Sequence, residues 1–344
     1  MKKILLFAVC LLLSLNVFSQ EKNFRPAQIN FGFPLSTTNV KKAKEYTNAF
    51  SINLLVGISK NERSLALAGV GNVISNNATG LQIAGVSNYI GNAGNGIAVA
   101  GVTNINKGAY NGIQVSGVYN YSGSGNGIAV AGVANMSKGS FMGLQLSGVT
   151  NIAGDVKGLQ FAGVANIAKK VKGVQFASIL NVAEESNFPI AFINIIKNGK
   201  MGVALSYDMM NNTMLSFRSG GKYTYGILGV GYNNLVNDGS KVVAEAGYGI
   251  HIPITDWIEI NNEFKATSVG FSNDKTCFNA SYLLAPSFTF FNHFNVFGGA
   301  SFNYFMSDYV NSNDLIPNNY FWSKDGNYNQ RMYIGYQVGL QYVF

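Results

Sequence analysis

The polar residues of this 344-residue chain that could do chemistry lie on alternate positions of predicted strands near residue 250. In one such strand, apolar side chains alternate with Glu245 and His251, so that one face is polar. Glu259, Glu263 and Lys265 follow on the next strand. A histidine beside carboxylates could bind a metal or transfer protons. The simpler interpretation is that these five side chains line a water-filled lumen and set its charge selectivity.

The sequence contains no motif of a common enzyme class. It has no Walker loop, no HExxH, no CxxC and no GxSxG. His293 lies in Phe291-Asn-His-Phe294, a pattern typical of a turn between strands. Cys277 has no second cysteine with which to pair in the predicted mature chain, and it sits among apolar residues. We therefore predict a protein without enzymatic activity, cofactor or metal site.

One long connection, Asp308–Gln330, interrupts the strand pattern of the C-terminal half. A loop of this length is usually functional or disordered. If both ends of a barrel face the periplasm, this loop faces the outside, where its aromatic and amide groups could bind a glycan or a protein. The alternative is a loop packed on the rim. The predicted extracellular residues are Asp308, Tyr320, Trp322 and Asp325.

These residues must be positioned by a sheet, because a short phrase recurs every 15 or 16 residues through the first half of the chain. Each copy is one extended segment followed by a turn. The clearest copies are Gly80-Leu-Gln-Ile-Ala-Gly-Val-Ser-Asn88, Gly96–Asn104 and Gly112–Asn120. Gln and Ala alternate at the second position after the leading glycine, which suggests a true unit of about 31–32 residues with two strands and two turns. We interpret this as strands of about 9–11 residues that run alternately up and down across a bilayer.

Charge placement supports a membrane location for the repeats. From Ser64 to Ala183 every charged residue falls in a predicted turn. A Lys or Arg that faces lipid at the midplane costs roughly 2–4 kcal/mol, which explains such exclusion. With a period of two, Leu159 and Phe161 face lipid and Gln160 faces the lumen. The predicted lumen-lining residues of the repeats are Gln82, Gln114, Gln145, Gln160 and Gln175.

The first residues have the pattern of an export signal. Lys2 and Lys3 precede an apolar run from Ile4 to Phe18, and a plausible cleavage site ends at Gln20. We therefore predict that residues 1–20 are a cleaved signal peptide and that the protein is exported to the outer membrane.

The composition fits a β-barrel in that membrane. Charged residues make up 12% of the chain, against about 25% in average proteins. The chain has 40 Gly, 24 Phe and 18 Tyr. Its net charge of +8 comes from scattered lysines and not from one basic face, so we predict no nucleic-acid partner.

We therefore predict an all-β fold, an antiparallel up-and-down transmembrane β-barrel of about 16–20 strands that leaves a channel. It comprises residues 21–344, with a repeat tract at 64–183 and an aromatic-rich C-terminal half at 188–344. The expected partners are outer-membrane lipid and small hydrated solutes or a surface ligand.

Two sets of residues carry a family resemblance. The ending Gly339-Leu-Gln-Tyr-Val-Phe344, with alternating Tyr342 and Phe344, resembles the C-terminal signal of Gram-negative outer-membrane barrels. That resemblance implies recognition by the barrel-assembly machinery. The repeats, including Gly173–Asn181 and Pro189–Asn194, resemble an uncharacterised bacterial surface-repeat family built on GLQIxGxxN phrases, which implies no activity and no functional residues.

Two functions remain open at this point. In the first, the barrel is a passive channel or a structural surface protein. In the second, the repeats wind into a surface-displayed β-solenoid adhesin or binding module, and Phe188–Phe344 forms an anchor of about eight strands. The recurrent Asn would then stack as a ladder, and the recurrent Val would point into the solenoid core. The charge-free repeat surface favours the first layout.

Overall fold

The computed structural model describes residues 23–32, 35–36, 40–236, 241–270, 277–308, 315–316 and 320–344, so the predicted signal peptide lies outside it. The described chain is all-β apart from the four-residue helix α2 (Val40–Ala43). No helix in this described part is both long and apolar enough to cross a membrane. The chain divides into two compact units, Met1–Gly163 and Val164–Phe344.

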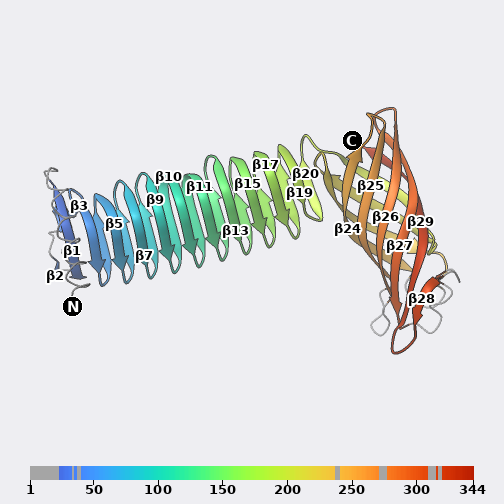
Figure 1. Ribbon diagram of the computed structural model, residues 1–344, viewed down its shortest axis with the longest axis horizontal. Helices are drawn as coiled ribbons and strands as arrows, with labels where there is room; N and C mark the ends of the chain where they lie inside the picture. Colours follow the sequence, from blue (N-terminus) through green and yellow to red (C-terminus); the bar gives the residue numbers. More distant parts are fainter. Residues whose placement is uncertain are drawn as a thin grey trace, which may run out of the picture. The chain divides into compact units, whose positions relative to one another are not determined.

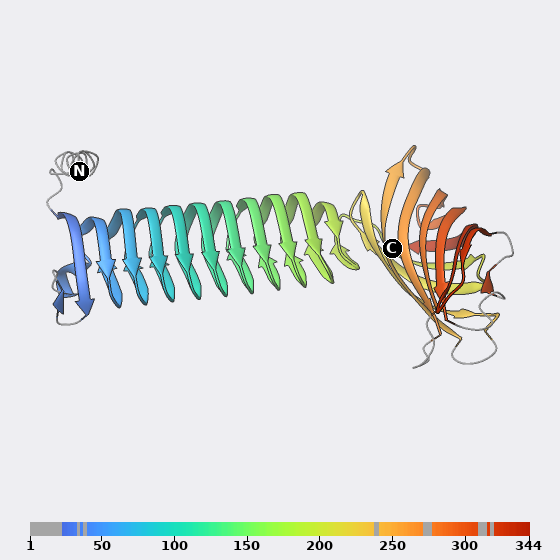
Figure 2. The same ribbon diagram turned by 60° about the horizontal axis from the view of Figure 1, so that its bottom comes forward.

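The first unit is a parallel β-solenoid (Figures 1 and 2). Each coil has a longer strand and a shorter strand, separated by a Gly-Val turn. The strands pair in parallel with their equivalents one repeat later, so that Gly96 lies beside Gly112, except for β2, which pairs antiparallel with β1. The strands of this unit are β1 (Phe24–Gly32), β2 (Leu35–Ser36), β3 (Thr47–Asn53), β4 (Val56–Ser59), β5 (Asn61–Ala68), β6 (Gly71–Ile74), β7 (Ala78–Ala84), β8 (Ser87–Ile90), β9 (Gly94–Ala100), β10 (Thr103–Ser116), β11 (Tyr119–Ala131), β12 (Ala134–Ser137), β13 (Phe141–Ser147), β14 (Thr150–Ile152) and β15 (Asp155–Ala162).

This arrangement corrects the prediction that the repeats are antiparallel barrel wall. Neighbouring phrases stack in the same direction and in register, with Ile97 beside Ile113. The alternation of Gln and Ala therefore reflects which side chain fills the interior of each coil. It does not indicate the direction of a strand. Because identical phrases stack in register, equivalent side chains of neighbouring coils lie next to each other. Side-chain amides can therefore form hydrogen bonds along the stack.

A ladder of buried asparagines runs through the interior of the coils. The Nδ2 of Asn88 donates to Oδ1 of Asn104 at 2.9 Å and to the backbone oxygen of Val99 at 2.8 Å. The ladder joins Asn72, Asn88, Asn104, Asn120, Asn135 and Asn151 in the first unit, and Asn166, Asn181 and Asn194 in the second. Burying an amide is tolerated only when it is hydrogen-bonded, so each rung fixes the register of the next coil.

The leading glycine of each phrase is required by backbone geometry. Gly96 has φ of 123°, a region that favours glycine, and a Cβ there would lie 2.1 Å from the backbone oxygen of Gly80. The coils can therefore approach closely only when this position has no side chain.

The recurrent valine points outward and not into the solenoid core, which corrects that part of the solenoid hypothesis. Val86 is 43% exposed and Val102 is 41% exposed. The glycine before each valine closes the turn, since a Cβ on Gly101 would lie 2.1 Å from the oxygen of Gly85. The interior is filled by Ala, Ser, Gln and Asn, together with larger side chains such as Ile74, Ile90 and Tyr110.

The second unit begins with further parallel coils and ends in a closed antiparallel barrel. The coil strands are β16 (Ala165–Ile167), β17 (Lys170–Ala177), β18 (Leu180–Ala183), β19 (Glu185–Ile190) and β20 (Ile193–Ile196). The barrel strands are β21 (Met201–Asp208), β22 (Asn212–Gly220), β23 (Thr224–Asn233), β24 (Val242–Pro253), β25 (Ile258–Val269), β26 (Cys277–Phe290), β27 (Phe294–Ser307) and β29 (Asn329–Val343). The short strand β28 (Tyr320–Lys324) pairs with β29 outside the ring.

The barrel has eight strands and not the predicted 16–20. Each strand pairs antiparallel with the next, and β21 pairs with β29 to close the ring. The predicted number of barrel strands is too high because it includes the repeats, and the repeats form a solenoid. The smaller barrel of the alternative layout is confirmed, although it begins at Met201 and residues 188–196 belong to the last coil.

The two rims of the barrel differ in the length of their connections. The chain enters β21 and leaves β29 at one rim, where the N–H of Phe344 donates to the oxygen of Met201 at 3.0 Å. We call this the short-turn rim, and the opposite one the long-loop rim. Strands are joined at the short-turn rim by residues 221–223, 254–257 and 291–293, and at the long-loop rim by 209–211, 234–241, 270–276 and 308–328.

The asparagine ladder yields a first prediction. Replacing Asn104 by Ala removes a rung and leaves the buried amide of Asn88 without its side-chain acceptor, which costs about 1–3 kcal/mol. Hydrogen–deuterium exchange of peptides from β9–β11 in the full-length protein should therefore become roughly tenfold faster or more. The matched control is Asn92→Ala, which removes an exposed asparagine that also bonds along the stack. Equal exchange in the two variants would show that the ladder does not stabilise the coils.

Candidate functional site: the filled barrel interior

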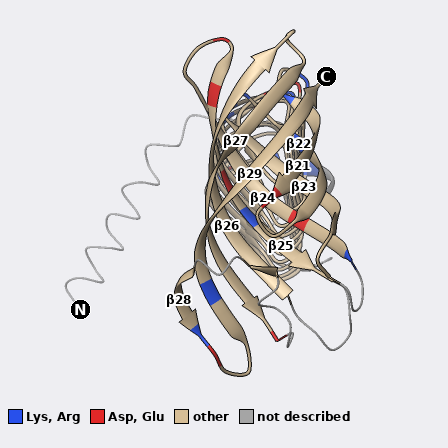
Figure 3. Ribbon diagram, turned by 90° about the vertical axis from the view of Figure 1, so that its right-hand side faces the viewer, with Lys and Arg blue, Asp and Glu red and all other residues tan. Residues whose placement is uncertain are grey.

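The charged residues of the barrel strands are gathered inside the barrel. Strand side chains alternate between the two faces of the wall, and the charged ones take the inward positions. Asp208, at the end of β21, is half-buried, and all other charged residues of these strands are buried. These are Arg218, Glu245, Glu259, Glu263, Lys265 and Arg331. Figure 3 marks how few positions along the barrel strands carry charge.

A fully buried carboxylate, Glu263, is at the centre of this interior. Its Oε1 lies 3.0 Å from Nη1 of Arg218 and accepts a hydrogen bond of 2.7 Å from the hydroxyl of Tyr225. The guanidinium of Arg218 also lies 4.2 Å from the ring centre of Phe297. The ion pair therefore bridges β22 and β25 through the middle of the barrel, beside a bulky aromatic ring.

A second group of contacts links other strands across the interior. Nζ of Lys265 lies 3.4 Å from Oε2 of Glu245 and donates to the side-chain oxygen of Gln337. The amide nitrogen of Gln337 in turn donates to Oγ of Ser206 at 2.8 Å, and the hydroxyl of Ser216 donates to Glu245. These contacts tie together β21, β22, β24, β25 and β29.

The buried histidine lies nearer the short-turn rim. Nδ1 of His251 is 2.9 Å from Oδ1 of Asn261 and 3.5 Å from Oε1 of Glu259, and its ring stacks on Tyr225 with centroids 4.1 Å apart. Glu259 also pairs with Nζ of Lys200 at 2.6 Å. Each carboxylate in this interior therefore has a cationic neighbour.

The interior combines this polar cluster with buried apolar side chains, among them Met214, Phe305 and Tyr333. The barrel strands contribute three buried cations and three buried carboxylates, so their formal charges balance. An eight-stranded barrel is just wide enough for side chains to fill it. Within the described residues, no group of three or more His, Cys, Asp or Glu could hold a metal ion. Such an arrangement can fix the shape of the barrel, whereas an open water channel would need a wider ring.

The predicted lumen residues divide between two places. The structure brings Glu245, His251, Glu259, Glu263 and Lys265 together inside the barrel, although in a packed interior. The glutamines of the repeats are instead buried inside the solenoid coils, where for example Gln160 donates to Gln145 at 2.8 Å. Those glutamines are Gln82, Gln114, Gln145, Gln160 and Gln175.

The predicted loop residues lie at the long-loop rim. Tyr320 and Trp322 belong to β28, and Asp325 follows it and pairs with Arg331 at 2.5 Å. Asp308 directly follows β27. Tyr320 and Trp322 are exposed, and the guanidinium of Arg331 lies 5.0 Å from the ring centre of Tyr320.

The residues of the predicted assembly signal lie at the other rim. Tyr342 and Phe344 are exposed at the end of β29, and the ring of Tyr342 contacts that of Phe294 with centroids 5.2 Å apart. His293 lies in the adjoining turn, as its pattern predicted, with Nδ1 2.9 Å from the oxygen of Val343.

Sequence reasoning missed Arg218 and Tyr225, which complete the cluster around Glu263. The signal for Arg218 was present, because it alternates with the outward-facing Leu215 and Phe217 along β22. Tyr225 gave no such signal, since β23 is buried on both faces at its start.

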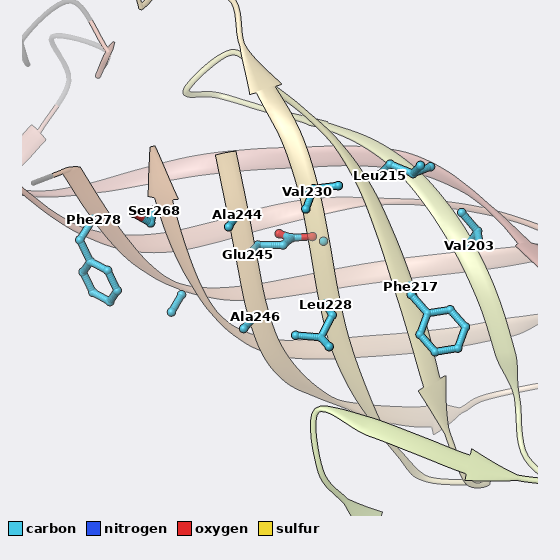
Figure 4. A pocket seen from close by; sticks show the side chains of 12 residues that line it. Val203, Leu215, Phe217, Leu228, Val230, Ala244, Glu245, Ala246, Ser268 and Phe278 are labelled. Carbon is cyan, nitrogen blue, oxygen red and sulfur yellow. The ribbon is translucent and has the colours of Figure 1, made fainter. Parts of the chain in front are cut away.

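The outer wall of the barrel is apolar. Val230, Leu215 and Leu205 are among its most exposed side chains. A shallow hollow in this wall, shown in Figure 4, is lined by outward-facing residues of β21–β26 such as Val203 and Phe217. The polar side chains of its lining are Glu245 and Ser268, and the other lining residues are apolar or glycine.

The last coil of the solenoid packs on this outer wall. The backbone N–H of Asn194 donates to Oγ of Ser219 at 3.0 Å, and its side-chain amide donates to the oxygen of Ser219 at 3.1 Å. Gly226 of β23 lies directly under the turn at Ala191 and Phe192, where a Cβ would be 2.2 Å from both backbone oxygens. The barrel wall thus ends the asparagine ladder and covers the open end of the coils.

Two aromatic stacks complete this junction. Phe188 stacks on Tyr223 in the short-turn rim, with ring centroids 5.3 Å apart. Phe192 stacks on Tyr248 of β24, with ring centroids 5.1 Å apart. The last coil is therefore held at two points of the wall by rings as well as by hydrogen bonds.

A buried carboxyl also occurs in the first unit. Glu62 accepts hydrogen bonds from Asn48 at 2.9 Å and from the hydroxyl of Ser51 at 2.7 Å. Burial raises the pKa of the Glu62 carboxyl from its ordinary value of 4.5 to about 7. Burial thus favours the neutral form of this carboxyl in the folded coils.

The sequence matches no family model, and no curated protein is significantly similar to it.

The central ion pair yields a second prediction. Arg218→Met removes the closest cation of a fully buried carboxylate and should lower the free energy of unfolding by about 3–5 kcal/mol. Urea unfolding of the full-length protein in detergent micelles measures this change. The double variant with Glu263→Gln should regain most of the loss, because no unpaired charge then remains. A single variant as stable as the unmodified protein would contradict this account of the interior.

The buried carboxyl of Glu62 yields a third prediction. In the unfolded chain the group ionises near 4.5, but in the folded coils it holds its proton to about 7. The folded state is therefore favoured at acidic pH, and up to about 3 kcal/mol of local stability is lost as the pH rises between these two values. Protection of peptides from β3–β5, taken relative to the intrinsic exchange rate at each pH, should fall over that range. In Glu62→Gln this protection should no longer change with pH, and an unchanged profile in that variant would refute the assignment.

Proposed function

We propose that this chain is an outer-membrane protein whose small, filled barrel anchors a β-solenoid at the periplasmic face of the membrane. The solenoid acts as a structural or binding module without enzymatic activity. One observation carries the proposal: a closed antiparallel barrel has apolar residues over its outer wall and buries nearly all its strand charges inside. A wall in water would have no reason to exclude charge, whereas a wall in lipid must.

The filled interior supports an anchor and not a channel. The ion pair of Arg218 and Glu263 and the ring of Phe297 occupy the middle of the barrel. Barrels that conduct solutes are wider, and their interiors hold water. The passive-channel alternative therefore has less support than the anchored solenoid.

The lengths of the connections support the orientation. Outer-membrane barrels have short periplasmic turns and longer extracellular loops. The last coil packs beside Tyr223 in the short-turn rim, and the chain continues from it through Lys200 into β21 at the same rim. The solenoid is then periplasmic and not surface-displayed, while the exposed Tyr320 and Trp322 face the outside.

Labelling of single cysteines on intact cells tests this proposal. In a Cys277→Ser background, Lys324→Cys on β28 should react with a membrane-impermeant maleimide. Lys138→Cys, at an exposed turn of the solenoid, should react only after the outer membrane is permeabilised. Reaction of Lys138→Cys on intact cells would contradict the proposal and favour a surface-displayed binding module. Recovery of the protein outside the outer-membrane fraction would refute the anchor itself.

A further inference from the structure

One edge of the solenoid is a column of exposed apolar residues. Every coil places the residue after its turn glycine, or the equivalent position, at this edge, and these side chains are 39–52% exposed. We call this column the Val edge. In the first unit it consists of Val70, Val86, Val102, Val118, Val133 and Val149, and in the second of Val164 and Ile179, with Phe192 at the same position in the last coil.

The two faces beside the Val edge are apolar as well. Outward residues on the longer strands include Ile83, Ile97, Ile128, Leu146 and Phe176. All charged residues between Ser64 and Ala183 lie at the opposite side of the coils, which we call the charged edge. They are Lys107, Lys138, Asp155, Lys157, Lys169, Lys170 and Lys172. Exposed apolar patches of this extent in a folded protein mark a membrane or protein contact.

The backbone N–H groups of the Val edge donate hydrogen bonds to the preceding coil. The N–H of Val86 donates to the oxygen of Val70 at 2.8 Å, and that of Gly85 donates to the oxygen of Ala68 at 3.1 Å. The same bonds recur in later coils, as from Val102 to Val86 at 3.0 Å. Lipid disfavours backbone N–H groups that are not bonded within the protein, and the N–H groups of these turns are so bonded.

The junction in the second unit shows how the two edges are oriented on the barrel wall. Ser186, beside the charged edge, lies against Gly221 in the short-turn rim, where a Cβ would be 2.7 Å from the backbone oxygen of Ser186. Phe192, on the Val edge, lies against Gly226 and Tyr248, farther along the wall. The charged edge is thus at the rim, and the Val edge points along the apolar wall away from it.

We propose that the Val edge and its neighbouring apolar faces insert among the acyl chains of the periplasmic leaflet, while the charged edge remains in water and among headgroups. This inference rests on the proposed function, because it needs a barrel wall that is in lipid. Lipid is the occupant that fits, since in the last coil the Val edge is continuous with that wall, and each coil of both units repeats the same residue types. The solenoid is then an interfacial element whose apolar edge and polar edge separate lipid from water.

Depth-dependent quenching in vesicles tests this inference. The full-length protein with Cys277→Ser is given one cysteine at Ile179 on the Val edge, at Lys172 on the charged edge, or at Val230 on the barrel wall. Each variant is labelled with a small fluorophore and reconstituted into phosphatidylglycerol–phosphatidylethanolamine vesicles that contain lipids with a quencher on the acyl chain. The probe at Ile179 should be quenched as strongly as that at Val230 and several-fold more than that at Lys172, which iodide should quench instead.

The outcomes separate the inference from the proposed function. If lipid quenches Val230 but not Ile179, the barrel is an anchor and the inference is wrong. If Ile179 is shielded from both lipid and iodide, a second copy of the chain covers the edge, and the inference is also wrong. If lipid quenches neither, the proposed function fails as well. Val164→Cys is a second site in this unit should Ile179→Cys not fold, and Val118→Cys extends the test to the first unit.

Discussion

Both units of this protein join buried polar side chains to one another inside and expose apolar side chains outside. In the solenoid, the asparagine ladder and the backbone bonds between coils do this, and Asn104 alone donates to one amide and two backbone oxygens. In the barrel, the ion pair of Arg218 and Glu263 and the contacts of Lys265 do the same. Because a buried polar group without a partner is costly, the strand register and barrel size must bring these groups together.

This inverted distribution links the fold to the proposed function. An apolar exterior whose turn N–H groups are bonded within the protein suits lipid, and the charged edge gives the coils a second surface suited to water. The junction at Ser219 joins the two structures without leaving the last rung of the ladder open. Anchor and solenoid therefore obey one physical rule, although one is antiparallel and closed and the other is parallel and stacked.

Much of this could be predicted from the sequence, because strand periodicity and charge placement are local properties. The alternation along β24 and β25 correctly placed Glu245 and Glu263 on an inward face. The direction of pairing could not be predicted in this way, because a phrase with period two reads the same in a parallel coil and in an antiparallel wall. The absence of charge from the repeats favoured the barrel-wall layout, which is wrong, because this absence likewise does not depend on the direction of pairing. The cluster around Glu263 was incomplete because the partner Tyr225 lies in a strand buried on both faces.

The measurement that tests the central claim most directly is the proximity of paired labels on the repeats. In a Cys277→Ser background, spin labels at Ile97→Cys and Ile113→Cys should show strong dipolar broadening, because parallel coils place these residues side by side, with strands about 4.8 Å apart. A pair at Val102→Cys and Ile113→Cys, which an antiparallel hairpin would bring together, should show little. Strong broadening for the pair at Val102→Cys and Ile113→Cys, without broadening for the pair at Ile97→Cys and Ile113→Cys, would contradict the solenoid. It would show instead that the repeats form an antiparallel barrel wall.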